Sequence, residues 1–509
     1  MHLTATLERS ARVYPDKAAL VADDQEISYA ELLDHARRAA TVLIDRGIRP
    51  GDRVAVMTCN TPGFVVAAFG AWFAGAALVP INHKFAAPEV AYAIDHSGAR
   101  IGIVAGDLAD TATTGSPDLM WLTTESGHGA LGDFDALVRA AEPVSGPVHT
   151  DLDAVAQVLY TSGTTSSPKG CLHTHRTLSA LAPALAATLG FTSDERFLLA
   201  MPIWHAAPLN DWLLTMISLG ATTVLMREFH PAAFLPAVAR HRITAFFGSP
   251  IAYLLPVQLA DAGQLDFDDH DLSTVSKWLY GGASLGEPTA RKLIAAYRSD
   301  RFFQVYGMSE MGPSGTALYP HEQVTKAGSI GRGGMVGVDL KLMSAAGDEV
   351  GPGEIGEIWL RGDSRMIGYL DNEAATAASF VGDWFRTGDV ARMDEDGYLY
   401  IVDRLKDVII VGGENVHSQE VEEALRGHPR VADVAVVGRP HPEWGETVVA
   451  VCVTTDGADI TADEIRDYLT DKLARYKIPR ETVVVDALPR NPSGKIVKHV
   501  LRESVAPAT

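Results

Sequence analysis

The sequence predicts an α/β fold, with a large N-terminal domain of two helix-covered sheets plus a β-rich subdomain, and a small C-terminal α/β domain. Its 509 residues, 47% of them hydrophobic, exceed what a single core usually holds. Strand-like and helix-like stretches alternate up to about residue 300, which favours parallel sheets covered by helices. After Gly333 the strands become shorter and the turns tighter, which indicates a separate β-rich region.

The N-terminal elements follow from local patterns. Ser28 and Glu31 form a capping box that opens an amphipathic helix, and Gly47 stops it. The uncharged stretch 64–81 is about as long as a membrane helix, but its glycines and Pro80 favour a buried helix that runs into a strand. Further strands are expected at 54–57, 77–79, 101–104, 155–159, 197–201, 222–226, 243–247 and 275–279, and further helices at 89–94, 209–217, 233–240 and 287–297.

Two regions depart from this alternation. The segment 106–151 is rich in Gly, Thr, Ser and Asp, so we interpret most of it as a surface connection. Beyond Arg404 we expect a smaller α/β unit with strands at 408–411, 434–437 and 448–453 and helices at 419–425 and after Thr461. The predicted domains are therefore 1–403 and 404–509.

Composition excludes several classes of function. With 43 Lys and Arg against 64 Asp and Glu, the net charge of -21 argues against non-specific binding to nucleic acid or to an anionic membrane. The three cysteines lie far apart without a Cys-x-x-Cys pattern, so neither a disulfide framework nor a structural zinc site is indicated. The N-terminus lacks a secretory pattern, and we expect a cytoplasmic protein without an integral membrane segment. The sequence leaves a homodimer open.

The stretch 160–170, Tyr-Thr-Ser-Gly-Thr-Thr-Ser-Ser-Pro-Lys-Gly, has the chemistry of a phosphate loop. Glycines permit unusual backbone conformations, hydroxyl side chains donate hydrogen bonds, and Lys169 supplies a positive charge. The alternative is an ordinary polar turn. It is not a Walker A loop, because no Gly-Lys-Ser/Thr follows Gly163 at the required spacing.

This loop resembles the phosphate loop of the adenylate-forming superfamily, which includes acyl-CoA and aryl-CoA synthetases, peptide-synthetase adenylation domains and beetle luciferases. Six further stretches resemble the motifs of that superfamily in the same order, from about Ser28 to Lys495. One departure is Ser166, where the family usually has Gly. A left-handed backbone at Ser166 would cost about 1 kcal/mol and would stiffen the loop.

The resemblance implies a role for each matching residue. Tyr306 would pack on adenine, Ser309 would touch the α-phosphate, and Glu310 would hold Mg²⁺. Asp389 would accept hydrogen bonds from the ribose, and Arg404 would contact ribose or phosphates. The residues assigned to binding of ATP or coenzyme A are Thr161, Ser162, Gly163, Thr164, Thr165, Lys169, Gly281, Gly282, Ala283, Tyr306, Gly307, Asp389, Arg404, Gly412 and Gly413.

The C-terminal domain is expected to be mobile. Lys406 occupies the hinge position, the glycines 412 and 413 would line the pantetheine tunnel, and Lys495 would be the catalytic lysine. Lys495, Thr165, Ser309 and Glu310 are the predicted catalytic residues, while His205, Trp204 and Tyr280 would line an acyl pocket together with Phe246 and Phe247. Each stretch alone also has a structural reading, as a turn, a charged linker or core aromatic residues. His173 and His175 have no gathered partner ligands in the sequence, so no metal is assigned to them.

The resemblance implies an ATP-dependent carboxylic acid–CoA ligase. A carboxylate would attack the α-phosphate, and a thiol would then take the acyl group from the adenylate. Three alternatives stay open at this point: an enzyme that loads a carrier protein, a non-catalytic nucleotide-binding regulator, and a luciferase-like oxygenase. The acid itself is aromatic, enoyl or medium aliphatic if the aromatic residues line its pocket.

Overall fold

The computed structural model describes residues 1–23, 25–125, 131–161, 168–405, 407–411, 414–441, 444–490 and 496–505. Packing divides the chain into two compact units. The first contains Met1–Leu340 and Leu360–Phe385, and the second contains Lys341–Trp359 and Arg386–Thr509. The predicted boundary between residues 403 and 404 marks the point about which domain 404–509 is expected to rotate relative to domain 1–403. This boundary stays a prediction.

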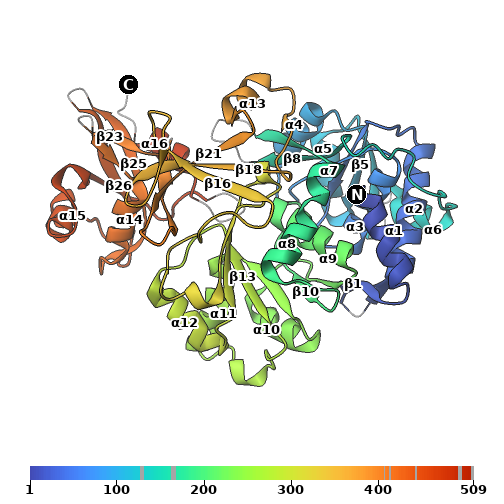
Figure 1. Cartoon of the computed structure of the whole chain (residues 1–509), viewed down its shortest axis with the longest axis horizontal. Coiled ribbons are helices and arrows are strands. Elements are labelled where there is room, and N and C mark those ends of the chain that lie inside the picture. Colours follow the sequence, from blue (N-terminus) through green and yellow to red (C-terminus); the bar gives the residue numbers. More distant parts are fainter. Residues whose placement is uncertain are drawn as a thin grey trace. The chain divides into compact units, whose positions relative to one another are not determined.

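The first unit contains an eight-stranded sheet in the order β15-β14-β13-β12-β10-β11-β1-β2. All neighbours are parallel except the two edge pairs, β14 with β15 and β1 with β2. The strands are β1 Ala18–Ala22, β2 Gln25–Ser28, β10 Arg196–Leu199, β11 Thr222–Leu225, β12 Ala245–Gly248, β13 Lys277–Gly281, β14 Phe302–Tyr306 and β15 Thr316–Leu318. Helices α10, α11 and α12 lie beside strands β12 and β13 of this sheet (Figure 1).

A second eight-stranded sheet of the first unit has the order β19-β9-β8-β4-β3-β5-β6-β7. The strands are β3 Arg53–Met57, β4 Ala77–Pro80, β5 Ile101–Ala105, β6 Met120–Thr124, β7 Gly132–Asp133, β8 Val155–Thr161, β9 Lys169–Thr174 and β19 Gly368–Tyr369. Strands β9 and β19 are antiparallel additions to a parallel sheet, and β19 comes from much later in the chain. Two helix-covered sheets were predicted, and both are confirmed.

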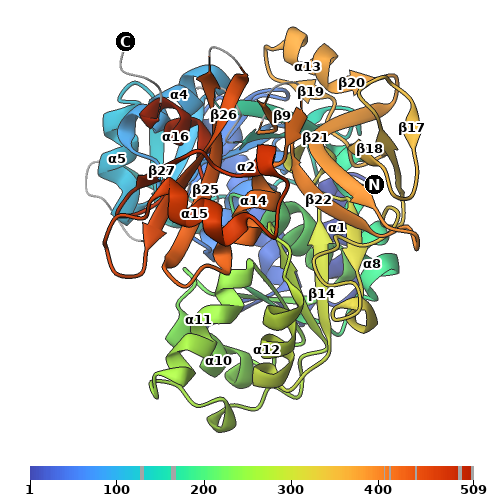
Figure 2. The ribbon, with the colours of Figure 1, turned by 90° about the vertical axis from the view of Figure 1, so that its left-hand side faces the viewer.

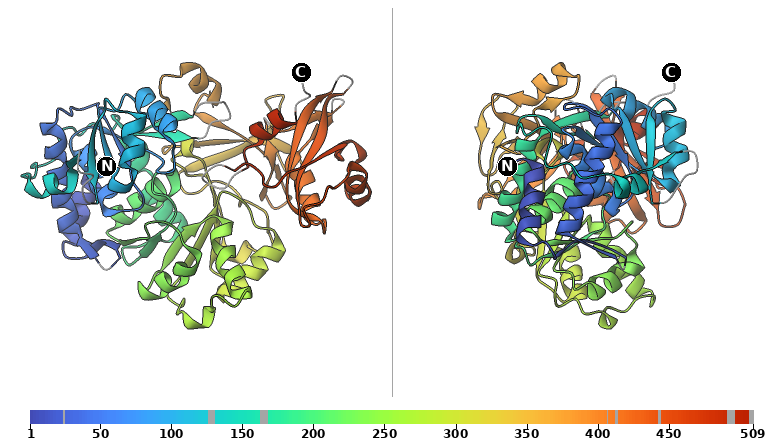
Figure 3. Two further views of the ribbon diagram at one scale, coloured as in Figure 1. Left: turned by 180° about the vertical axis from the view of Figure 1, so that it is seen from behind. Right: turned by 90° about the vertical axis from the view of Figure 1, so that its right-hand side faces the viewer.

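Helices of the first unit follow the predicted alternation. Their bounds are α1 Leu3–Val13, α2 Tyr29–Asp45, α3 Pro62–Phe73, α4 Ala87–Ser97, α5 Ala109–Gly115, α6 Phe134–Ala140, α7 His175–Ser179, α8 Leu181–Leu189, α9 Leu214–Leu219, α10 Pro231–Arg240, α11 Pro250–Asp261, α12 Glu287–Tyr297 and α13 Glu373–Ser379. The predicted capping box is present, because Ser28 accepts from the Glu31 N–H and Glu31 accepts from the Ser28 N–H. Helices α1, α2 and α3, blue in Figure 3, pack against one another.

The interpretation of 106–151 as mostly a surface connection is wrong. This segment contains α5, β6, β7 and α6, and β6 pairs in parallel with β5. Trp121 and Leu122 of β6 are buried, and so is Phe134 of α6. These apolar residues anchor the segment to the sheet. The polar residues between them make the strand and helix patterns hard to detect in the sequence.

The predicted helix at 209–217 begins in an unusual form. Residues Ala207–Leu213 form a π-helix, labelled η2, which continues directly into α9. A π-helix has a wider turn than an α-helix and is frequent at functional sites.

The region after Gly333 forms a third sheet, in the order β17-β16-β18-β21-β20 with β22 paired to β21. Its strands are β16 Val338–Met343, β17 Glu349–Val350, β18 Ile355–Gly362, β20 Phe380–Val381, β21 Trp384–Met393 and β22 Leu399–Arg404. The short strands at the start of this region agree with the predicted β-rich subdomain.

The end of the chain forms a fourth sheet in the second unit. It contains β23 Ile409–Val411, β24 Glu414–Val416, β25 Val431–His441, β26 Gly445–Thr454 and β27 Glu481–Val484, with helices α14 Ser418–Arg426, α15 Ala462–Leu469 and α16 Lys498–Ser504. Helices α14 and α16 pack against β25, and Figure 2 shows the helices beside these strands. Short 3₁₀ turns occur at Gly106–Leu108 (η1), Phe267–Asp269 (η3), Ser309–Met311 (η4), Pro320–Glu322 (η5) and Arg475–Lys477 (η6). In the described part of the chain, no helix has the length and apolar character needed to cross a bilayer.

Two stacked histidines join the N-terminus to α7. The rings of His2 and His175 lie 3.6 Å apart, and both residues are buried. Burial, with the nearby His149, lowers the pKa of His2 to about 4 and the pKa of His175 to about 3. Both rings are therefore neutral in the folded protein near pH 7.

We expect His175→Phe to reduce the loss of stability at acid pH. The folded-state pKa values lie below the ordinary histidine value of about 6.5, so the unfolded chain binds more protons and stability falls as pH drops below about 6.5. The loss is about 1.4 kcal/mol per pH unit for each histidine until its folded-state pKa is reached. Thermal unfolding between pH 7.5 and 5.5, followed by tryptophan fluorescence, measures it.

The matched control is His321→Phe, because the side chain of His321 is 79% exposed. This control should keep the pH dependence of the wild-type melting temperature. Equal pH dependence in the wild type and in His175→Phe would show that the stacked pair is not responsible.

Candidate active site

The predicted phosphate loop connects strands β8 and β9 as a hairpin. Thr161 at the end of β8 lies opposite Lys169 at the start of β9. The loop residues Ser162, Gly163, Thr164, Thr165 and Ser166 lie outside the described residues. The hydroxyl of Tyr92 donates to the carbonyl of Pro168 at 2.8 Å, which anchors the base of the hairpin to α4.

The predicted adenine and metal residues lie at the end of β14. Tyr306 is the last residue of the strand, and Ser309 and Glu310 begin η4. Gly307 allows a close approach, since a Cβ there would lie 1.5 Å from the Pro313 carbonyl oxygen. Only glycine fits this position, and the turn that presents Ser309 and Glu310 depends on it.

His173 of β9 holds this turn by a hydrogen bond. Its Nε2–H donates to the carbonyl oxygen of Ser309 at 2.8 Å. Burial lowers the pKa of His173 to about 4, so the ring is neutral. His173 therefore joins the strand that follows the phosphate loop to the turn that carries Glu310.

Tyr369 makes a second connection between the same two elements. Its hydroxyl donates to Oε1 of Glu310 at 2.9 Å, and its ring centre lies 5.0 Å from Nζ of Lys169. Backbone hydrogen bonds join the same segments. The Met366 N–H donates to the Glu310 carbonyl at 2.7 Å, and the Leu370 N–H donates to the Gly170 carbonyl at 2.8 Å. Sequence analysis missed Tyr369, because only the pairing of β19 with β9 brings it to the site.

Glu310 fits a hard divalent cation. Its carboxylate is an acceptor-only group with lone pairs beyond the one that Tyr369 uses, and the residue is only partly buried. Carboxylate oxygens of this kind are the protein ligands that Mg²⁺ takes beside phosphate oxygens.

The predicted glycine wall lies at the end of β13. Gly281 is buried, and a Cβ there would lie 2.7 Å from the Val305 carbonyl oxygen and 3.1 Å from the Phe247 ring. Gly282, with φ of +83°, and Ala283 are exposed at the strand end. Tyr280 is buried, and its hydroxyl lies 2.7 Å from Oε1 of Gln323.

Trp204 and His205 follow β10. Their rings lie 3.6 Å apart, and Trp204 is buried while His205 is partly exposed. The indole Nε1–H of Trp204 donates to Nδ1 of His83 at 3.1 Å. His83 in turn fixes Trp204, which is one of the predicted acyl-pocket residues.

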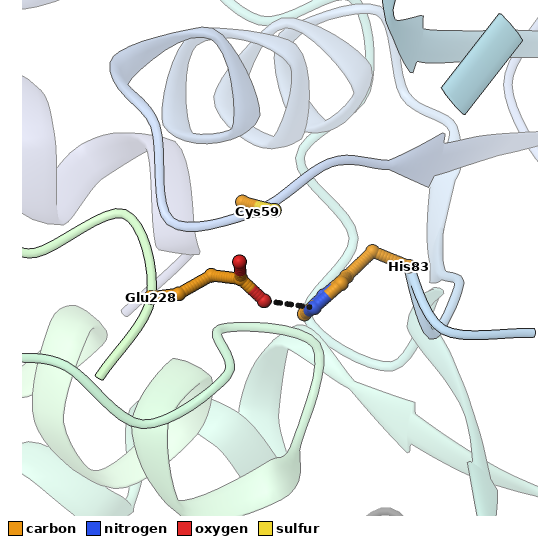
Figure 4. Close-up of side chains that lie close together, drawn as sticks. All are labelled: Cys59, His83 and Glu228. Carbon is orange, nitrogen blue, oxygen red and sulfur yellow. Dashed lines mark hydrogen bonds and ion pairs between the residues drawn. The ribbon is translucent and has the colours of Figure 1, made fainter. Parts of the chain in front are cut away.

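His83, the hydrogen-bond partner of Trp204, belongs to a cluster of possible metal ligands, which Figure 4 shows. Cys59, His83 and Glu228 place their ligand atoms within 4.8 Å of one another. Since Trp204 donates to Nδ1, the neutral ring of His83 carries its proton on Nε2, which donates to Glu228 at 3.2 Å. Both ring nitrogens of His83 are then used, and burial raises the pKa of Cys59 to about 11. This geometry favours a hydrogen-bonded chain over a metal site.

The second unit carries the other predicted nucleotide residues. Asp389 lies opposite Arg404 in the pairing of β21 with β22, and its Oδ1 lies 3.0 Å from Nε of Arg404. Asp389 is buried, while 44% of the Arg404 side chain is exposed. The preceding residue, Asp403, is buried and accepts from the backbone N–H and hydroxyl of Ser418. The predicted hinge Lys406, the glycines 412 and 413, and the predicted catalytic Lys495 lie outside the described residues.

Comparison with known proteins identifies the family of the chain. The model of the AMP-binding enzyme family matches residues 7–370, and that of the AMP-binding enzyme C-terminal domain matches residues 420–495. A feruloyl-CoA synthase from Amycolatopsis sp is 38% identical over 97% of both chains. A long-chain-fatty-acid–CoA ligase from Mycobacterium tuberculosis is 34% identical over 98% of this chain and 97% of its own.

The fold matches a solved enzyme of the same kind. The o-succinylbenzoate CoA synthetase from Bacillus subtilis, in complex with its acyl-adenylate intermediate, superposes with a TM-score of 0.86 at 30% identity. The match covers 98% of this chain and 97% of that chain. The chain therefore belongs to the AMP-binding enzyme family, among the acyl-CoA and aryl-CoA synthetases of the adenylate-forming superfamily.

Proposed function

We propose that this chain, an AMP-forming acyl-CoA synthetase by family, activates an aryl or other largely apolar acid. In the first half-reaction the carboxylate of the acid attacks the α-phosphorus of ATP. The new O–P bond forms as the bond to the β-phosphate breaks, which gives the acyl-adenylate and pyrophosphate. No general base is needed, because a carboxylate is ionised near neutral pH.

The observation that carries this proposal is the junction of Lys169, Tyr369 and Glu310. It places a cation at the exit of the phosphate hairpin close to a carboxylate that suits Mg²⁺. In our assignment Lys169 restrains the β- and γ-phosphates, and Lys495, Thr165 and Ser309 meet charge that develops at the α-phosphate. Glu310 would hold Mg²⁺, which would supply positive charge near the leaving phosphate oxygens.

The second half-reaction transfers the acyl group to a thiol. We propose that domain 404–509 rotates about Lys406 relative to domain 1–403, which withdraws Lys495 and brings in the loop with Gly412 and Gly413. The coenzyme A sulfur then attacks the acyl carbon, a C–S bond forms, and the bond to AMP breaks as the thiol proton is released. A carrier protein as acceptor is the second candidate, since the same chemistry serves a carrier-bound thiol.

Several features support an apolar acid. Trp204 and His205 follow β10 with their rings 3.6 Å apart, and Phe247 lies beside Gly281. We assign these residues to the acyl pocket together with Tyr280. The relative at 38% identity is named for a feruloyl product, which favours an aryl acid over a long aliphatic one. We propose a cytoplasmic location and leave the homodimer as a prediction.

The first test is pyrophosphate release from MgATP across aryl, enoyl and aliphatic acids, each with and without coenzyme A. We expect acid-dependent release and stoichiometric acyl-CoA, with aryl acids preferred. Release without acyl-CoA would favour a carrier protein as acceptor. If no acid of the panel caused pyrophosphate release, a non-catalytic nucleotide-binding protein would be supported. Light emission would support the luciferase-like oxygenase.

Lys495→Ala should separate the two half-reactions. We expect adenylation to fall at least about 100-fold, the usual scale for loss of a charge that acts in the transition state. Thioester formation from a supplied acyl-adenylate should remain within a few-fold of the wild type. Equal loss in both reactions would contradict the proposed division between the two domain orientations.

Tyr369→Phe should weaken the metal-dependent part of ATP binding. The substitution removes the hydroxyl that holds Glu310 but keeps the ring beside Lys169, and a hydrogen bond to a charged group contributes about 1.5–3 kcal/mol. We expect the Mg²⁺ concentration for half-maximal ATP binding to rise about tenfold or more, measured by calorimetry without the acid.

Tyr92→Phe is the matched control, since its hydroxyl contacts the Pro168 carbonyl and not Glu310. It should leave the Mg²⁺ requirement unchanged. Tyr369→Leu should also weaken ATP binding at saturating Mg²⁺, because it removes the ring beside Lys169. If Tyr369→Phe and Tyr92→Phe behaved alike, Tyr369 would not be positioning Glu310.

A further inference from the structure

Asp211 is a buried carboxyl group that the proposed chemistry does not use. Only 5% of the residue is exposed, and Oδ1 has no hydrogen-bond partner among the described residues. Burial raises the pKa of Asp211 well above its ordinary value. A buried polar atom without a partner costs about 1–3 kcal/mol, and native proteins rarely keep one without a reason.

The position of Asp211 is fixed by its two neighbours in the π-helix η2. Asn210 exchanges two side-chain hydrogen bonds with Gln157 of β8, at 3.0 and 2.9 Å, and both residues are fully buried. Trp212 lies 5.1 Å from the Phe247 ring, which borders Gly281. Asp211 therefore lies on a segment held between the strand that enters the phosphate loop and the residues beside the glycine wall.

A second unpartnered group lies one turn further along the same helix. Thr215 is completely buried, and its Oγ1 also lacks a hydrogen-bond partner among the described residues. Thr215 follows Asp211 by four residues, across the junction of η2 with α9. Asp211 and Thr215 thus offer a carboxyl acceptor and a hydroxyl donor on one short helical segment, and neither Oδ1 nor Oγ1 has a partner among the described residues.

This pair is complementary to an alcohol or phenol. A hydroxyl group can donate to Asp211 and accept from Thr215 at once, whereas a methyl or hydrogen substituent would leave both buried groups without partners. No described salt bridge involves Asp211, and the environment disfavours a full charge. An uncharged hydroxyl therefore fits better than an ammonium group.

We propose that Asp211 and Thr215 bind a hydroxyl group on the acid, at the end away from the reacting carboxylate, and so make the enzyme selective for hydroxylated acids. This inference rests on the proposed function, because it assigns the pair to the acyl pocket. Sites built to bond a hydroxyl reject the analogue that lacks it by large factors, up to about 10⁴-fold.

The test compares matched acids that differ in one substituent: 4-hydroxycinnamate, 4-aminocinnamate, 4-methylcinnamate and cinnamate. The readouts are kcat/KM for pyrophosphate release with MgATP and coenzyme A, and equilibrium binding of each acid by calorimetry. We expect the wild type to prefer 4-hydroxycinnamate over cinnamate at least about 100-fold in kcat/KM. In Asp211→Leu and Thr215→Val this ratio should fall below about tenfold. The ratio of Asp211→Asn should lie between these values and that of the wild type.

Thr223→Val is the matched control. Thr223 lies in β11, is also buried, and its Oγ1 also lacks a partner among the described residues. This variant should keep the wild-type ratio. Asp211→Leu should also raise the melting temperature, because it removes an unpartnered buried carboxyl group. A stability loss with an equal drop for all four acids would make Asp211 structural and overturn the proposal.

The remaining outcomes also test the proposed selectivity for a hydroxyl group. Turnover of all four acids at similar rates would leave the ligase function standing and show that the pair holds only a water molecule. A preference for 4-aminocinnamate would overturn the assignment to a hydroxyl. If no acid released pyrophosphate, the proposed function would fail, and the calorimetric binding ratio would still test the hydroxyl preference separately.

Discussion

The contact of Tyr369 with Glu310 and Lys169 is the constraint on which the rest of the nucleotide site depends. One side chain touches the carboxylate that we assign to the metal and the cation that follows the phosphate loop. The contact exists because β19 pairs with β9, so that residues far apart in the chain share one sheet edge. Backbone hydrogen bonds from Met366 and Leu370 hold the same segment at both ends. The spacing between Glu310 and Lys169 is thus set by sheet register, which is stiffer than a loop.

The side of the site that we propose for the acid depends on a different structural feature. The π-helix at 207–213 widens the turn between two anchors, the Gln157–Asn210 amide pair and the Trp212–Phe247 contact. A regular α-helix would rotate the residues between these anchors, so the wide turn determines where Asp211 points. An unpartnered buried carboxyl group lowers stability, and proteins retain such groups where binding requires them. Among the described residues, Glu310 and His173 on the nucleotide side have hydrogen-bond partners, whereas Oδ1 of Asp211, which we propose to contact the acid, has none.

The sequence predicted local features well and long-range contacts poorly. The capping box at Ser28 and the alternation of strands and helices depend on neighbouring residues, and the structure confirms both. The segment 106–151 was misjudged, because its buried large apolar residues, such as Trp121, Leu122 and Phe134, are widely spaced among polar ones. Tyr369 and the His83–Trp204 contact had no local signal, since each depends on segments that only the fold brings together. The family motifs located Glu310 and Lys169, but not the side chain that joins them.

The net charge of the chain, -21, gives no overall attraction for an anionic triphosphate. A general positive field is absent, so the triphosphate must be met by individual groups at short range. Arg404 is already paired with Asp389 at 3.0 Å, and part of its charge is used within the second unit. If ribose hydroxyls donate to Asp389, as the family resemblance implies, the carboxylate can accept them together with Arg404, because it has lone pairs beyond the one that Arg404 uses.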